Sequence, residues 1–113
     1  MVTIAILQEF GANTEEALAR CLDNEEFYLK LVDMGIHDEK FEQLGKQLAD
    51  GDLDGAFETC HALKGVLANL ALGPLGEVAD EMTENLRSRM QMDCMPMYDR
   101  MMSERQRLLT MIG

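Results

Sequence analysis

The sequence predicts an all-α fold, an up-down antiparallel four-helix bundle with a short additional N-terminal helix. Hydrophobic residues make up 47% of the 113-residue chain and aromatic residues only 5%, and ten methionines accompany no tryptophan. Aliphatic and thioether side chains that recur three or four positions apart are typical of packed helices rather than of strands. The turns between the predicted helices are short, which favours antiparallel neighbours. We expect one domain over residues 1–113, with 1–36 as an N-terminal helical cover and 38–112 as most of the bundle.

Capping residues and apolar spacing mark the predicted helices of the N-terminal half. Asn13, with Glu16 three residues later, is typical of a capping box and begins a short helix. Asp23 or Asn24 caps a second helical segment, which Gly35 interrupts. The expected apolar faces of these two segments are Ala17, Leu18, Cys21 and Leu22, and then Phe27, Leu31 and Met34.

The C-terminal half is predicted to contain four further helices. The first follows Asp38 and ends at the turn formed by residues 49–52. Asp52 caps the second, which runs to about Leu72, and a proline suits the first turn of each of the other two. Asp93 caps the last helix. The expected inner faces are, in chain order, Phe41, Leu44 and Leu48; Leu53, Phe57, Cys60, Leu63, Leu67 and Leu70; Leu75, Val78, Ala79, Met82 and Leu86; and Met97, Met101, Leu108 and Met111 or Ile112.

Composition excludes several classes of function. A formal net charge of −11 argues against nucleic-acid binding, which requires clustered lysine and arginine. The three cysteines are widely spaced and form no C-x-x-C pair, so we expect neither a disulfide framework nor a metal site. No apolar run approaches the roughly 18 residues of a membrane span, and the N-terminus lacks the basic region of a signal peptide. We therefore expect a soluble, cytoplasmic protein that is monomeric because its surface is acidic.

One stretch, residues 60–72 (CHALKGVLANLAL), combines a helical core pattern with two polar residues one turn apart. His61 lies off the apolar stripe, and Lys64 lies at its edge, with its ammonium group expected to reach past the imidazole. Lys64 is the only lysine or arginine between Lys46 and Arg87, a stretch rich in acidic residues. An exposed imidazole beside an ammonium group suits reversible phosphorylation, because a neutral ring nitrogen can attack phosphorus and the lysine can stabilise the added charge.

Gly65 lies about one turn from His61 on the same side of this helix. Glycine inside a helix costs about 1 kcal/mol relative to alanine. We interpret it as keeping the surface low beside the histidine so that a partner can approach. Ala68 shares this exposed side.

The motif H-A-L-K-G at residues 61–65, followed by A-N-L at 68–70, resembles the H-x-L-K-G signature of histidine-containing phosphotransfer (HPt) domains. The resemblance extends to the acidic turn before this helix, the GPL start of the next helix and the N-terminal segment EEALARCLDNEEFYLKLV, so it covers nearly the whole chain. Many members carry a glycine after A-N-L, whereas this chain has Ala71 and Leu72 before Gly73, a difference at the expected docking surface.

The resemblance implies a phosphorelay carrier of two-component signal transduction. His61 would accept a phosphoryl group from the aspartyl-phosphate of one receiver domain, in a response regulator or hybrid sensor kinase, and pass it to another receiver. Lys64 would stabilise the phosphoryl charge, and Gly65, Ala68 and Asn69 would contribute to receiver binding. Such domains have no kinase or phosphatase centre and no cofactor of their own, because the receiver supplies the magnesium.

Two other functions remain open from the sequence. A helical adaptor or inhibitor of the same fold would bind a receiver or a sensor kinase without accepting phosphate. Alternatively, the protein would be an obligate helical dimer, with its methionine-rich last helix as the interface. The intact set of His61, Lys64 and Gly65 favours the carrier, because a pure binder has no need of the imidazole.

Overall fold

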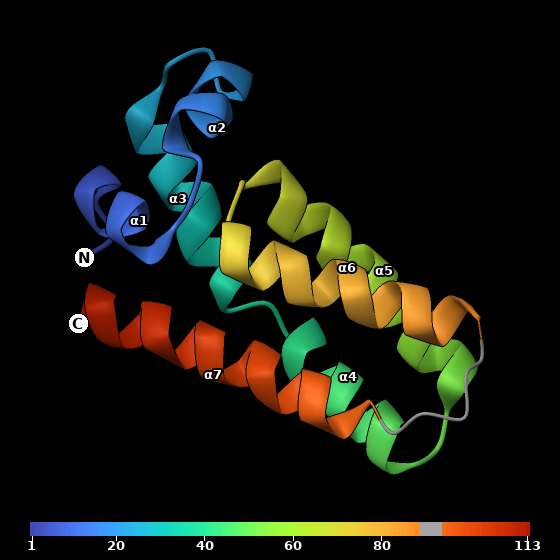
Figure 1. Ribbon diagram of the computed structural model, residues 1–113. Helices are drawn as coiled ribbons and strands as arrows, with labels where there is room; N and C mark the ends of the chain where they lie inside the picture. The colour runs from blue at the N-terminus through green and yellow to red at the C-terminus, as the bar shows by residue number, and fades with distance from the viewer. Residues whose placement is uncertain (89–93) are drawn as a thin grey trace.

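The computed structural model of the chain describes residues 1–88 and 94–113 (Figure 1). Within these residues it contains seven helices and no strand, which confirms the all-α prediction. The helices are α1 (Ile4–Phe10), α2 (Thr14–Arg20), α3 (Glu25–Ile36), α4 (Lys40–Ala49), α5 (Leu53–Asn69), α6 (Gly73–Arg87) and α7 (Met95–Ile112). The predicted cap Asp93 lies outside the described residues. None of the helices in the described ranges is long and apolar enough to cross a membrane.

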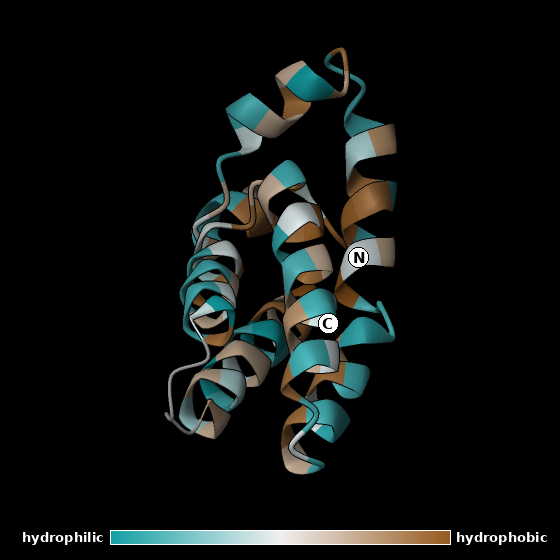
Figure 2. Cartoon of the chain, turned by 90° about the vertical axis from the view of Figure 1, so that its right-hand side faces the viewer, coloured by the Kyte–Doolittle hydropathy of each residue, from teal (hydrophilic) through white to brown (hydrophobic). Residues whose placement is uncertain are grey.

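The four C-terminal helices form an antiparallel bundle. Helix α5 packs between α4 and α6, and α7 closes the bundle by contacting both α6 and α4. Figure 1 shows these helices alternating in direction, with α1, α2 and α3 grouped at the end where α5 turns into α6. The two chain ends lie side by side there, because the Met1 ammonium group donates to the Ile112 carbonyl at 2.8 Å. In Figure 2 hydrophobic and hydrophilic residues alternate along the helices, as expected of amphipathic elements.

Local caps begin several helices where the sequence predicted them. The side chains of Asn13, Asn24 and Asp52 each accept a hydrogen bond from a backbone N–H three residues later, at 3.0–3.1 Å. These bonds satisfy N–H groups that have no partner inside the helix. The turn before α5 also forms as predicted, and Gly51 adopts a φ of +74° in it. The predicted faces of α6 and of the first half of α7 are buried.

Helix α3 differs from the prediction in the face that it buries. Gly35 lies in its last turn, one residue before the helix ends at Ile36 and close to the predicted break, and its missing side chain leaves room for Leu70. A Cβ atom at Gly35 would come within 2.7 Å of the Leu70 Cδ1 atom. Phe27 and Met34, predicted to face inward, are 49% and 61% exposed. The residues that α3 buries are Tyr28, Val32, Gly35 and Ile36.

Other sequence predictions failed at helix ends. Helix α1 was not predicted, although Thr3 caps it by accepting from the backbone N–H of Ile6 at 3.1 Å. Leu22 is 90% exposed, because α2 ends at Arg20 and Leu22 itself has a positive φ of 55°. Leu53, predicted to be buried, is 42% exposed at the first position of α5. Helix α5 ends at Asn69, three residues before the predicted end.

Three arginines form hydrogen bonds with the C-terminal ends of helices other than their own. Each donates to backbone carbonyls at the end of another helix, where the last C=O groups have no partner in their own helix. The bonded pairs are Arg20 with Ala68 and Asn69 at 2.9 and 3.2 Å, Arg105 with Ile36 at 2.7 Å, and Arg107 with Phe10 at 3.0 Å. These bonds fix the N-terminal helices to the bundle.

The contact between α4 and α7 generates a stability prediction. A Cβ atom at Gly45 would come within 2.6 Å of the Tyr98 Cζ atom, and the Tyr98 hydroxyl donates to the Phe41 carbonyl at 2.9 Å. Gly45→Ala should therefore displace the ring and lower the free energy of unfolding by about 1–3 kcal/mol. Gly65→Ala is the matched control, because a Cβ atom there meets nothing within 4 Å. It should raise stability by about 0.5–1 kcal/mol. Equal effects of the two variants in urea unfolding would contradict the described packing.

Candidate functional site

Helix α5 is held by one buried face, and this fixes which of its residues face outward. The buried residues are Ala56, Thr59, Cys60, Leu63 and Leu67. They pack against α6 and α4. His61, Gly65, Ala68 and Asn69 are consequently exposed. The candidate residues therefore lie along one exposed side of a helix whose other side is anchored in the core.

The His61 imidazole stacks on an aromatic ring of its own helix. Phe57 lies one turn earlier, and the two ring centroids are 5.8 Å apart with an angle of 19° between the ring planes. The Arg87 guanidinium lies over the Phe57 ring, 5.4 Å from its centroid. The sequence placed Phe57 in the core, but it is only half-buried and supports the histidine instead. The i, i+4 spacing explains this contact.

The Lys64 ammonium group forms an ion pair across the bundle. Its Nζ lies 2.9 Å from the Oδ1 atom of Asp80 on α6. The side chain of Lys64 is 32% exposed, so its stem lies along the bundle as predicted. The ammonium group was expected from the sequence to reach past the imidazole, but in the structure it pairs with Asp80. Sequence reasoning missed this partner, because Asp80 was one of many acidic residues in the stretch.

The surface beside His61 is open. A Cβ atom added to Gly65 would meet nothing within 4 Å. Glycine is therefore not required there by packing within the described residues, which agrees with a role in leaving space for a partner.

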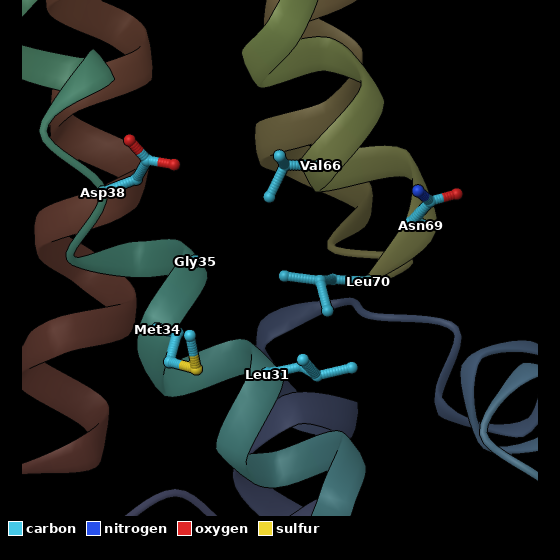
Figure 3. A pocket seen from close by; sticks show the side chains of 7 residues that line it. All are labelled: Leu31, Met34, Gly35, Asp38, Val66, Asn69 and Leu70. Atoms are coloured by element: carbon cyan, nitrogen blue, oxygen red, sulfur yellow. The ribbon is translucent and has the colours of Figure 1, made fainter.

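An apolar cleft adjoins this side of α5 (Figure 3). It has a volume of about 330 Å³, and its walls come from α3 and α5. It is lined by Leu31, Met34, Gly35, Asp38, Val66, Asn69 and Leu70. Figure 3 shows Leu31 and Met34 of α3 on one side, with Val66 of α5 and Leu70, the residue after that helix, on the other. Asn69 thus belongs both to the exposed side of α5 and to the cleft. The cleft was not predicted from the sequence, because Leu31 and Met34 were expected to face the core.

Ala68, on the same exposed side of α5, lies outside the apolar cleft. It lines a shallow hollow with residues of the α1–α2 turn and of the start of α6. Arg20 donates to the carbonyls of Ala68 and Asn69, and its guanidinium also forms an ion pair with Glu16. A cation therefore lies at the end of α5, beside the predicted receiver-binding residues. The sequence carried no signal for this arginine, because the contact joins residues 48 and 49 positions apart.

Cys60 precedes His61 but faces the core. Its thiol accepts a hydrogen bond from the Thr83 hydroxyl at 3.2 Å and lies 3.5 Å from the Ala79 carbonyl oxygen. Burial raises the pKa of the Cys60 thiol to about 11, so the thiolate form that binds metals is scarce at neutral pH. Cys60 and His61 therefore lie in different surroundings, the thiol in the core and the imidazole at the surface. No group of three potential metal ligands lies together in the described part of the chain.

The second histidine has a different environment. His37 ends α3 and is exposed, and its Nδ1 atom lies 2.8 Å from the Asp33 carbonyl oxygen. The same nitrogen lies 3.7 Å from the Asp33 carboxylate. His37 thus has an acidic neighbour one turn away, where His61 has a lysine. It offers an internal comparison for any chemistry assigned to His61.

Comparison with protein families finds a match that includes the motif. The model of the family described as Hpt domain matches residues 37–112. The match covers the whole of α4, α5, α6 and α7, which form the bundle, and includes the H-A-L-K-G motif. No curated protein and no solved structure matched the chain.

The stacked rings generate a spectroscopic prediction. In Phe57→Leu the helix should persist, because leucine is a good helix former, while the ring current acting on His61 disappears. The imidazole proton resonances of His61 should move downfield in the variant, and those of His37 should stay in place. Unchanged His61 resonances would show that the two rings do not stack in solution.

Proposed function

This chain belongs to the Hpt domain family, and we propose that it is a phosphorelay carrier in which His61 is the phosphoacceptor. Hpt domains carry phosphoryl groups in phosphorelays. The observation that carries the assignment to His61 is its position: an exposed imidazole in the family motif, one turn from a lysine and beside an open glycine. Lys40 also follows His37 by three residues, but it belongs to the next helix, α4, and its ammonium group pairs with Asp38 at 3.5 Å.

The proposed transfer needs only the imidazole of this chain as nucleophile. A neutral ring nitrogen of His61 attacks the phosphorus of an aspartyl-phosphate. The N–P bond forms as the P–O bond breaks, and the electron pair of that bond leaves with the aspartate carboxylate. The reverse reaction on the carboxylate of a second receiver regenerates the imidazole. The magnesium ion that balances charge in this step belongs to the receiver, and the carrier needs no kinase or phosphatase centre of its own.

The docking face is proposed to run from His61 to the apolar cleft. Gly65 leaves the approach to the imidazole open, and Asn69 joins this approach to the cleft. Met34, 61% exposed at the cleft, is an apolar side chain that a receiver would cover. We expect the partners to be receiver domains of response regulators or hybrid sensor kinases. They would meet this chain as a monomer in the cytoplasm.

Transfer from a phosphorylated receiver tests the assignment of His61. The wild type should acquire acid-labile, base-stable label from a phosphorylated receiver, and His61→Gln should acquire none. His37→Gln is the matched control and should be labelled like the wild type. If His61→Gln is still labelled, the acceptor is another residue. Binding of receivers without any labelling would support an adaptor in place of a carrier.

Gly65 tests the steric part of the docking face. Gly65→Gln should weaken receiver binding by about tenfold, or about 1.4 kcal/mol, because the added side chain fills the approach beside His61. Gly65→Ala adds only a methyl group and serves as the control for changes in helix stability. Calorimetric titration of both variants with one receiver measures the effect. A wild-type affinity for Gly65→Gln would remove the steric role of this position.

A further inference from the structure

We propose that Asp80 is a positioning residue that competes with the phosphorylated His61 for the Lys64 ammonium group and so sets the lifetime of the phosphohistidine. This inference rests on the proposed function. The family motif accounts for the histidine, the lysine and the glycine, but it does not include this carboxylate of α6. The ion pair between Lys64 and Asp80 is the observation that carries the inference.

Lys64 has two possible anionic partners, the Asp80 carboxylate and a phosphoryl group on His61. Lys64 follows His61 by three residues, so the two side chains are neighbours on α5. Asp80 lies on the adjoining helix α6, with its Oδ1 atom 2.9 Å from the lysine Nζ. The lysine side chain is flexible and carries a compact charge, so small rotations about its four-carbon stem redirect it. A phosphoryl group on His61 would place new anionic oxygens beside the same ammonium group.

The ion pair is weak enough to exchange. The Asp80 side chain is 59% exposed and that of Lys64 is 32% exposed, so solvent screens their attraction. A phosphoryl group carries more negative charge than a carboxylate and should draw the ammonium group away. Asp80 still competes after phosphorylation, so the wild type holds the lysine on the phosphoryl group for only part of the time.

The occupancy of Lys64 on the phosphoryl oxygens changes the lifetime of the phosphohistidine. Hydrolysis of the N–P bond passes through a loose transition state that resembles metaphosphate. The phosphoryl oxygens carry less charge there than in the phosphohistidine, so an ammonium group bound to them stabilises the phosphohistidine more. Releasing Lys64 from Asp80 should therefore lengthen the lifetime, and removing Lys64 should shorten it.

The next residue of α6 provides a matched control. Glu81 is also an exposed carboxylate, and it forms an ion pair with Arg100 of α7 at 2.6 Å, away from Lys64. Glu81→Gln changes the net charge by the same amount as Asp80→Asn and also removes one ion pair between helices. A general effect of charge or of bundle stability would therefore appear equally in both variants.

The experiment loads His61 with phosphoramidate, which requires no partner protein, and follows the loss of the phosphohistidine by ³¹P NMR. Asp80→Asn should lengthen the half-life about two- to fivefold, the range expected from the loss of a partly exposed competitor. Asp80→Glu and Glu81→Gln should keep the wild-type half-life. Lys64→Ala should shorten it, and the double variant Lys64→Ala/Asp80→Asn should match Lys64→Ala alone. A wild-type half-life in Asp80→Asn, or an equal lengthening in the Lys64→Ala background, would overturn the proposal, because Asp80 would then not act through Lys64.

A second readout separates this inference from the proposed function. Titration of the unphosphorylated protein with inorganic phosphate, followed through the Lys64 side-chain resonances, needs no phosphotransfer. Asp80→Asn should bind phosphate about two- to fivefold more tightly than the wild type or Glu81→Gln. If His61 cannot be loaded while this difference is found, the carrier assignment fails, and only the competition of Asp80 with other anions for Lys64 stands. If His61 is loaded and neither measurement responds to Asp80→Asn, only the role of Asp80 fails.

Discussion

The burial of one face of α5 between α4 and α6 is the constraint on which the rest of the structure depends. Small and aliphatic side chains such as Ala56, Cys60 and Leu63 are fully buried, so the helix can rotate little without exposing them. With that face fixed, His61 and Gly65 must lie outside. The nucleophile of the proposed reaction is therefore held in place by core packing, although its imidazole is exposed.

The same constraint brings together the features that surround the histidine. Phe57 and Lys64 lie one turn before and after His61, so a single helix supplies the ring that stacks on the imidazole and the ammonium group beside it. Helix α6, packed alongside, brings Asp80 to the lysine. Helix α3 adds the second wall of the apolar cleft, and the absence of a side chain at Gly35 lets Leu70 approach it. The imidazole, the ion pair of the lysine and the apolar cleft thus come from α5 together with residues of α6 and α3.

Local signals were predictable from the sequence, and choices that depend on tertiary packing were not. Asn13 and Asp52 cap their helices as expected, because a cap joins a side chain to a backbone N–H three residues away. Helix α3 carries two apolar rows, and periodicity alone cannot say which row is buried. These rows are Phe27, Leu31 and Met34, which are exposed or only partly buried, and Tyr28, Val32 and Ile36, which are buried. The motif located His61 and Lys64, but pairing between Lys64 and Asp80 depends on the register of two helices, which no local pattern encodes.

The exposed side of α5 and the adjoining cleft are proposed to form one receiver-binding face around His61. The most direct test is to map amide chemical-shift changes in this chain when it binds a receiver domain held in its active form by beryllofluoride. The changes should concentrate in residues 61–70 and 31–38, which comprise His61, Gly65 and the lining of the cleft. Changes concentrated instead on α7, or on α1 and α2, would contradict this proposal and would place the receiver on another face of the bundle.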